Sequence, residues 1–330
     1  MSPQVSPAME QRDRASSLDA TVESGIAVRS KIWMPYGDII LQVGFTQFRV
    51  NRDVLAKHSS VFRDLFSVPQ PANEPTTNGC HTVQLYDSAD DWAELLAVLY
   101  EPFQTSASRP LGVVAAMLRL GLKYDIPESR KEALERLHYE FPATLDAWEK
   151  VDQLSKIQDQ KGIHVDLLNL VLQCGVHSCV PALGFACLNE FYTLEMLLGG
   201  VRRDDGSRAA LLIQPCAMLI VALERLLLFQ RESLSWLKDE AIVPDDSCMS
   251  QSLCKREKMA INHSVFWKCP DEAYDLGYTL DPWDEAWSGK LCESCERAAK
   301  DYYEASRQKG WASLPSFFGL PEWKDLRDVE

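Results

Sequence analysis

The sequence lacks the motifs that mark most enzyme active sites. It contains no Gly-x-x-x-x-Gly-Lys phosphate loop, no His-Glu-x-x-His metal site and no Gly-x-Ser-x-Gly nucleophile turn. Cys80 and His81 are neighbours, but they end a loop rich in Pro and Asn, and we interpret Cys80 as an ordinary loop thiol. We therefore expect a protein that is not an enzyme.

Basic residues are scarce relative to acidic ones. The chain has 34 Lys and Arg against 48 Asp and Glu, a formal net charge of -14, and no run of basic residues forms a patch. Surfaces that bind nucleic acid or anionic membranes need positive charge to displace counterions. Zinc fingers of DNA-binding regulators also need paired His, and His263 alone follows residue 180. The sequence thus argues against nucleic acid and membrane as partners.

Long uninterrupted apolar runs are also missing. The most apolar stretch, residues 209–229, contains Gln214, Pro215, Glu224 and Arg225, so we interpret it as a buried helix and not as a membrane span. The first thirty residues show no apolar core of a secretory signal. Ten cysteines without such a signal indicate a reducing compartment. We expect an intracellular protein, cytoplasmic or nuclear.

The most strongly patterned stretch of the chain is residues 37–66. Apolar residues alternate at positions 39, 41 and 43 and again at 48 and 50, with Gly44 between the two runs, which predicts a β-hairpin. From Asn51 the apolar spacing becomes helical, and Ser59 is placed to cap a second short helix. A hairpin followed by two short helices is a compact folding nucleus.

This stretch resembles the opening of a BTB/POZ domain. The resemblance rests on Asp38, the apolar strand, Gly44 and the pattern Phe48-x-Val50-x-Arg52-x-Val54-Leu55-Ala56-x-x-Ser59-x-Val61-Phe62-x-x-Leu65-Phe66. Three segments resemble, in their sequence, the fungal, basidiomycete-type group of BTB-domain proteins: residues 37–43, residues 66–71 and the closing segment 311–320. One departure is Asn51 before Arg52, where such domains usually carry His before the basic residue.

The predicted fold class is α+β, with a small sheet and stacked helices forming the BTB/POZ fold at residues 31–140. A third strand is expected at residues 82–85, and Ser88 and Pro127 are placed to open helices. Before this domain, residues 1–30 have little to bury and predict a disordered tail.

The rest of the chain divides into an all-α extension, residues 141–240, and a small Cys- and Trp-rich C-terminal segment, residues 241–330. The apolar spacing of the extension predicts helices at residues 145–157, 165–174, 180–198 and 208–237.

Two cysteine pairs carry the strongest sign of a site, Cys248-x5-Cys254 and Cys292-x2-Cys295. A Cys-x-x-Cys pair lets both thiolates reach one tetrahedral ion, and a second pair completes four ligands. We predict that Cys248, Cys254, Cys292 and Cys295 bind one structural zinc ion, because this segment has few apolar runs with which to build a core.

Two alternatives stay open at these cysteines. The first spacing is loose, so Cys269 or His263 can replace either member of a pair, and buried thiols without metal are the competing interpretation. The cysteines in apolar helical runs are instead expected in the core: Cys174, Cys179, Cys187 and Cys216.

The resemblance implies a role in protein–protein interaction, by self-association as a homodimer or by docking another protein. BTB domains place the counterparts of Asp38 and Arg52 near their dimer surface, so we take these two residues and Trp33 as the candidate partner-binding residues. The competing interpretation of Asp38 and Arg52 is an ion pair that helps to fix the fold. The alternative function is a substrate adaptor of a cullin-type ubiquitin ligase, although no propeller or sandwich follows residue 140.

Overall fold

The computed structural model describes residues 27–69, 76–101, 108–151, 154–191, 193–266 and 275–329. Most of the tail predicted for residues 1–30 lies outside this description, and the first strand already begins at Val28.

A four-stranded sheet forms from β1 (Val28–Trp33), β2 (Ile39–Val43), β3 (Thr46–Val50) and β4 (His81–Leu85). The predicted hairpin is confirmed, because β2 and β3 are antiparallel with Leu41 opposite Phe48. β1 adds parallel to β3 and β4 adds parallel to β2, which gives the order β1-β3-β2-β4. The buried face of the hairpin starts the core, since Leu41 and Phe48 are fully buried.

Five helices belong to the same part of the chain: α1 (Arg52–His58), α2 (Ser60–Ser67), α3 (Ala89–Tyr100), α4 (Leu111–Lys123) and α5 (Pro127–Glu140). The predicted caps are confirmed. Ser59 accepts the backbone N–H of Phe62 at 3.0 Å, and Ser88 accepts that of Asp91 at 3.3 Å. Phe62 in turn stacks on Tyr124, with ring centroids 5.1 Å apart, so the capped helix places its main aromatic side chain in the core.

The extension is helical, apart from one short hairpin of β5 (Val201–Arg202) and β6 (Arg208–Ala209). Its helical elements are α6 (Leu145–Lys150), α7 (Ile163–Gln173), η1 (His177–Cys179), α8 (Val180–Glu190), α9 (Leu194–Gly199), α10 (Ile213–Ser233) and η2 (Ser235–Leu237).

Three expected helix boundaries in the extension are wrong. α6 ends at Lys150 and not at residue 157, since the buried carboxylate of Glu140 accepts the backbone N–H groups of Leu154 and Ile157 at 2.7 and 3.3 Å. The helix expected at 180–198 is two helices, because Thr193 caps α9 by accepting the backbone N–H of Met196 at 3.2 Å. Side chains that bind backbone N–H groups thus set these two boundaries. The third is the start of the helix expected at 208–237, which begins at Ile213 because Arg208–Ala209 pair with Val201–Arg202 as a strand.

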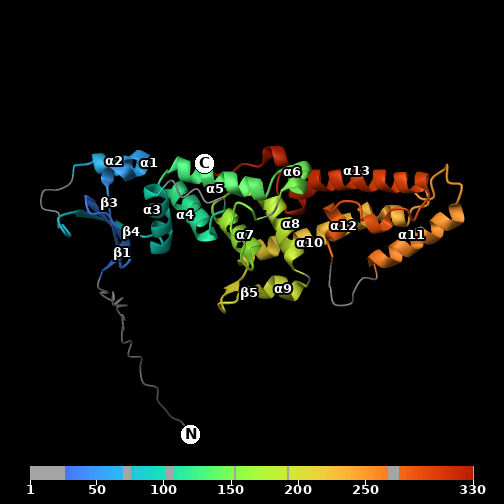
Figure 1. The fold of residues 1–330 in the computed structure, drawn as a ribbon, viewed down its shortest axis with the longest axis horizontal. Coiled ribbons are helices and arrows are strands. Elements are labelled where there is room, and N and C mark those ends of the chain that lie inside the picture. The colour runs from blue at the N-terminus through green and yellow to red at the C-terminus, as the bar shows by residue number, and fades with distance from the viewer. Residues whose placement is uncertain are drawn as a thin grey trace, which may run out of the picture.

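The last part contains α11 (Gln251–Phe266), α12 (Gly277–Leu280), η3 (Glu285–Trp287), α13 (Glu293–Phe317) and η4 (Trp323–Asp325). α13 runs back from the far end of an elongated molecule towards its middle (Figure 1). It packs on α10 at close range, where a Cβ atom on Gly310 would lie 2.5 Å from the ring of Phe229. The absence of a side chain at Gly310 therefore permits this packing.

Two apolar cores result from this arrangement. The first is continuous from Ile39 in the sheet, through α7 and α8, to Phe318 after α13. The second lies at the far end and includes Trp236, Trp287 and Tyr303. The first core crosses the boundaries predicted at residues 140 and 240, and the division of the chain into four parts stays a prediction.

Within the described residues, α10 is the one helix that is long and apolar enough to cross a membrane, by length and composition. Of its most apolar window, 39% is buried. Its Gln230 side chain donates to the carbonyl oxygen of Asp275 at 2.9 Å and accepts from the hydroxyl of Thr279 at 2.7 Å. α10 is thus held along one face by packing and polar contacts, and less than half of its most apolar window is buried.

Candidate functional site

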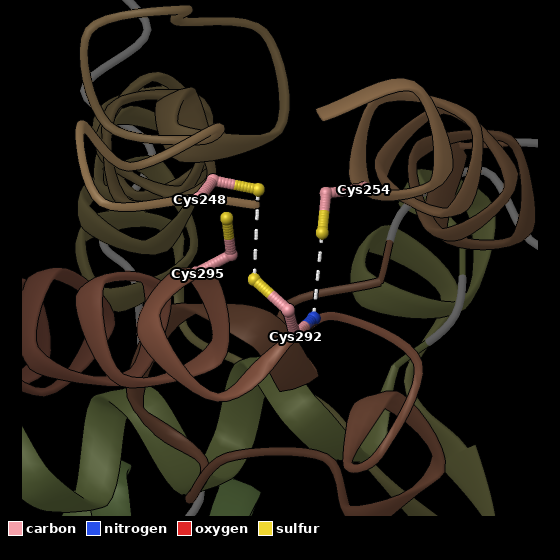
Figure 2. A group of neighbouring side chains, drawn as sticks. All are labelled: Cys248, Cys254, Cys292 and Cys295. Atoms are coloured by element: carbon pink, nitrogen blue, oxygen red, sulfur yellow. Dashed lines mark hydrogen bonds between the residues drawn. The ribbon is translucent and has the colours of Figure 1, made fainter. Parts of the chain in front are cut away.

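Four cysteines from three separate segments meet in one group (Figure 2). The group belongs to the part of the chain around α11 and the start of α13, at one end of the molecule (Figure 1). Cys248 lies in the loop before α11, Cys254 lies in α11, and Cys292 and Cys295 lie at the N-terminal end of α13. Their sulfur atoms are all within 4.8 Å of one another. The structure therefore brings together the four residues that the sequence predicted as one site.

The cluster fits a tetrahedral metal ion. Zn–S bonds of about 2.3 Å place the four sulfur atoms of such a site roughly 3.8 Å apart. The Sγ atoms of Cys292 and Cys248 are 3.6 Å apart, and the longest separation in the group stays below 4.8 Å. Cys254 and Cys295 are fully buried, which suits a closed structural site.

Backbone N–H groups are directed at two of the sulfur atoms. Cys292 donates its N–H to Sγ of Cys254, and Asp245 donates its N–H to Sγ of Cys295, both at 3.3 Å. Such donors stabilise the thiolate form, which is the form that binds metal. The hydroxyl of Ser294 lies 3.4 Å from Sγ of Cys292. The surroundings of the cluster are therefore suited to negatively charged sulfur.

The four thiols are not equivalent in acidity. The Ser294 hydroxyl and the backbone N–H of Cys295 lower the pKa of the Cys292 thiol to about 6. Burial raises the pKa of the Cys254 thiol and of the Cys295 thiol. A bound cation would lower all of them, because metal binding and thiol deprotonation are linked. Without a cation, burial favours thiols over thiolates at Cys254 and Cys295.

The alternative metal ligands that the sequence leaves open are His263 and Cys269. His263 is not a member of the group, and Cys269 lies outside the described residues. Cys80 ends a turn before β4 and is buried, with Sγ 3.5 Å from the carbonyl oxygen of Gly37. Of the cysteines expected in the core, Cys216 is partly exposed and the others are buried: Cys174, Cys179 and Cys187.

Sequence reasoning missed one buried residue beside the cluster, Lys258. It is 5% exposed and lies one helical turn after Cys254 on the buried face of α11. Its ammonium group donates to the carbonyl oxygens of Asp239 and Val243 at 3.1 and 2.5 Å. The sequence held a signal, since the buried face of α11 is otherwise formed by Cys254, Ile261 and Val265.

The candidate partner-binding residues lie at the opposite end of the molecule. Trp33 pairs across the sheet with Arg49, and Arg49 donates through Nε to the carbonyl oxygen of Gly37 at 2.8 Å. Asp38 directly precedes β2, and Arg52 lies two residues after the end of β3. Trp33, Asp38 and Arg52 thus share one end of the sheet, where the Asp38 carboxylate is more than half exposed.

Asp38 has a clear structural role. Its carboxylate accepts the backbone N–H of Arg52 at 2.8 Å, the first residue of α1, and its other oxygen lies 3.8 Å from the Arg52 guanidinium. Asn51, the cap position of α1, forms no capping bond with its own side chain. Asp38 therefore satisfies a helix N-terminus in place of Asn51.

A groove of about 620 Å³ lies between α1, α3 and α5. Its apolar floor includes Val54 and Leu99, and its rim carries both signs of charge: Lys57, His58, Arg109, Glu128, Lys131, Glu132 and Glu135. Arg109 pairs with Glu132 at 2.8 Å, so part of the rim is neutralised internally. The groove favours no one class of ligand.

Residues 33–140 match the model of the BTB/POZ domain family. These residues contain the β2–β3 hairpin, the strand β4 and the helices α1–α5. They are a BTB/POZ domain, a protein–protein interaction module. No curated protein matches the chain.

Proposed function

We propose that the chain is a non-catalytic, intracellular protein-interaction protein that acts through its BTB/POZ domain, by self-association or by docking a partner. The observation that carries this proposal is the BTB/POZ domain at residues 33–140, with its sheet and helices formed as that module requires. The described cysteines carry no disulfide, which suits a reducing compartment, cytoplasmic or nuclear.

The proposed contact surface is the end of the sheet that carries Trp33, Asp38 and Arg52. Trp33 offers a half-buried aromatic ring with the Arg29 guanidinium 4.5 Å above it. Aromatic and Arg side chains of this kind dominate many protein interfaces. Because Asp38 also fixes α1, we expect Trp33 to contribute more to partner affinity than the ion pair does.

Sedimentation of the full chain over a wide concentration range tests the proposal. We expect reversible self-association that Trp33→Ala weakens by at least tenfold. Tyr86→Ala is the matched control, since Tyr86 is 88% exposed but follows the other edge strand, β4. A chain that stays monomeric at all concentrations, and whose native partners bind Trp33→Ala unchanged, would overturn this surface.

We also propose that Cys248, Cys254, Cys292 and Cys295 hold one structural zinc ion. Sulfur separations near the tetrahedral value and the two N–H donors support this site. Metal analysis of protein purified without added zinc is expected to give one ion per chain, and none in Cys292→Ser/Cys295→Ser. Equal metal content in the two proteins would exclude the site.

The alternative function is a substrate adaptor of a cullin-type ubiquitin ligase. We also propose that the chain belongs to the fungal, basidiomycete-type group of BTB-domain proteins that its sequence resembles. Binding of a purified cullin scaffold to the full chain would favour the adaptor. Self-association without cullin binding would favour the first proposal.

A further inference from the structure

A buried lysine without a carboxylate partner needs a source of negative charge. Lys258 is 5% exposed, and within the described residues no carboxylate lies within ion-pair distance of its ammonium group. Asp239 and Glu240, which precede the helix, favour the charged form of Lys258 at longer range, but each has a closer partner of its own. Asp239 accepts the backbone N–H of Ala241 at 2.8 Å, and Glu240 pairs with Lys255 at 3.2 Å. A buried cation left this way is costly unless another group compensates it.

The cysteine cluster is a further source of negative charge near Lys258, besides Glu240 and Asp239. Cys254 and Lys258 are four residues apart on the same buried face of α11, and Cys295 interacts electrostatically with the ammonium group. Four thiolates outweigh the two positive charges of a zinc ion, so a loaded centre keeps an excess of negative charge in an apolar core. The apolar surroundings of the site include Trp236, Val243 and Ile261.

Lys258 also holds the loop that completes the cluster. Its two carbonyl acceptors, on Asp239 and Val243, lie at the start of the loop that leads to Cys248. The same loop carries Asp245, whose backbone N–H is directed at Sγ of Cys295. One side chain therefore supports both a ligand-bearing loop and a hydrogen bond to a ligand.

We propose that Lys258 is the positioning residue of the metal centre, which fixes the Cys248 loop and compensates the excess charge of the four thiolates. This inference rests on the proposed zinc site. It makes the buried lysine and the thiolates mutually dependent: the cation is tolerated because the cluster is charged, and the charged cluster is tolerated because of the cation.

Three substitutions of Lys258 in the full chain separate the loop contact from the charge. Lys258→Met removes both, Lys258→Gln keeps a hydrogen-bond donor without charge, and Lys258→Arg keeps both. Zinc affinity is measured by competition with a chromophoric chelator. We expect Lys258→Met and Lys258→Gln to lower the zinc affinity about ten- to a hundredfold, as changes beside metal ligands do. The zinc affinity of Lys258→Arg should stay within a few fold of wild type. Lys255→Met is the matched control, since Lys255 is on the same helix and 46% exposed.

The outcomes distinguish this inference from the zinc site itself. Zinc content in wild type no higher than in Cys292→Ser/Cys295→Ser would overturn the site. Wild-type zinc affinity in Lys258→Gln would overturn the charge role alone, and this test holds even if Lys258→Met does not fold. Unfolding with and without chelator is a second readout: we expect Lys258→Gln to destabilise the zinc-loaded protein more than the zinc-free protein. Equal destabilisation would mean that Lys258 is only a loop contact, which contradicts the proposal.

Discussion

The carboxylate of Asp328 accepts both the backbone N–H and the hydroxyl of Ser178, at 2.8 and 2.7 Å, across 150 positions of sequence. The same carboxylate lies 3.3 Å from Nε2 of His138 on α5. Next to it, Val329 donates its backbone N–H to the carbonyl oxygen of Gly175 at 3.0 Å. The last described residues thus join the extension to the BTB/POZ domain.

The first prediction concerns this contact. Burial acts to raise the pKa of Asp328, but hydrogen bonds from His138 and Ser178 outweigh it and lower the pKa to about 2. Because the folded pKa is below the unfolded value of about 3.9, the carboxylate stabilises the fold above about pH 4, and this contribution is lost as pH falls towards 2. Asp328→Asn should cost roughly 2 kcal/mol at pH 7.

Urea unfolding at pH 7 and pH 3 measures this cost. The difference between wild type and Asp328→Asn should shrink at the lower pH. Asp325→Asn, which changes an exposed carboxylate in the same segment, should have little effect at either pH. A cost independent of pH would contradict the assignment.

The second prediction concerns Glu140, a fully buried carboxylate. It accepts backbone N–H groups of Leu154, Lys156 and Ile157, so Glu140→Ala leaves several buried donors without a partner. We expect a loss of about 3 kcal/mol and faster amide exchange at residues 154–157. Exposed Glu135 on the same helix provides the control, Glu135→Ala. Unchanged exchange in Glu140→Ala would show that the loop is held by other contacts.

The third prediction is that the BTB/POZ domain folds on its own, but more stably with residues 141–160 attached. Ile157 is fully buried in the first core, and Arg109 exchanges backbone hydrogen bonds with Lys156 and Gln158 at 3.0 and 2.8 Å. Fragment 27–160 should therefore exceed fragment 27–140 by about 2 kcal/mol in free energy of unfolding. A non-cooperative transition in both fragments would disprove independent folding.

The fourth prediction tests the folding nucleus. Phe62 is fully buried between Trp92 and Tyr124, with ring centroids 5.8 and 5.1 Å away. Phe62→Ala should cost about 4 kcal/mol, the usual range for a buried aromatic, and Phe62→Asp should prevent folding. Phe45, at 54% exposed, is the control, and Phe45→Ala should change stability by less than about 0.5 kcal/mol. Circular dichroism during thermal unfolding gives both values.

The fifth prediction concerns metal removal. Trp236, Trp283 and Trp287 pack together in and against the second core, which also contains the cysteine cluster. A chelator should therefore change the tryptophan fluorescence and destabilise this end first, by several kcal/mol at saturating zinc. Amides of the sheet should keep their protection from exchange. In Cys292→Ser/Cys295→Ser the chelator should have no effect.

The sequence by itself determined the local elements. Alternation at positions 39, 41 and 43 and at 48 and 50 predicted the hairpin. The hydroxyls of Ser59 and Ser88 marked the starts of α2 and α3, because a capping side chain accepts a backbone N–H group only three residues further along its own helix. The spacing of Cys292 and Cys295 likewise identified half of a metal site, since both thiols can reach one ion from a single turn.

Only the tertiary structure decided which distant groups meet. The second cysteine pair joins the first because α11 and α13 pack at one end around a shared core, and no periodicity along the chain encodes that packing. The irregular path of residues 154–157 depends on Glu140, and the buried Lys258 is held by the carbonyl oxygens of Asp239 and Val243. Long-range contacts of this kind override local helix propensity, because an unsatisfied buried charge or N–H group costs more than a turn of helix contributes.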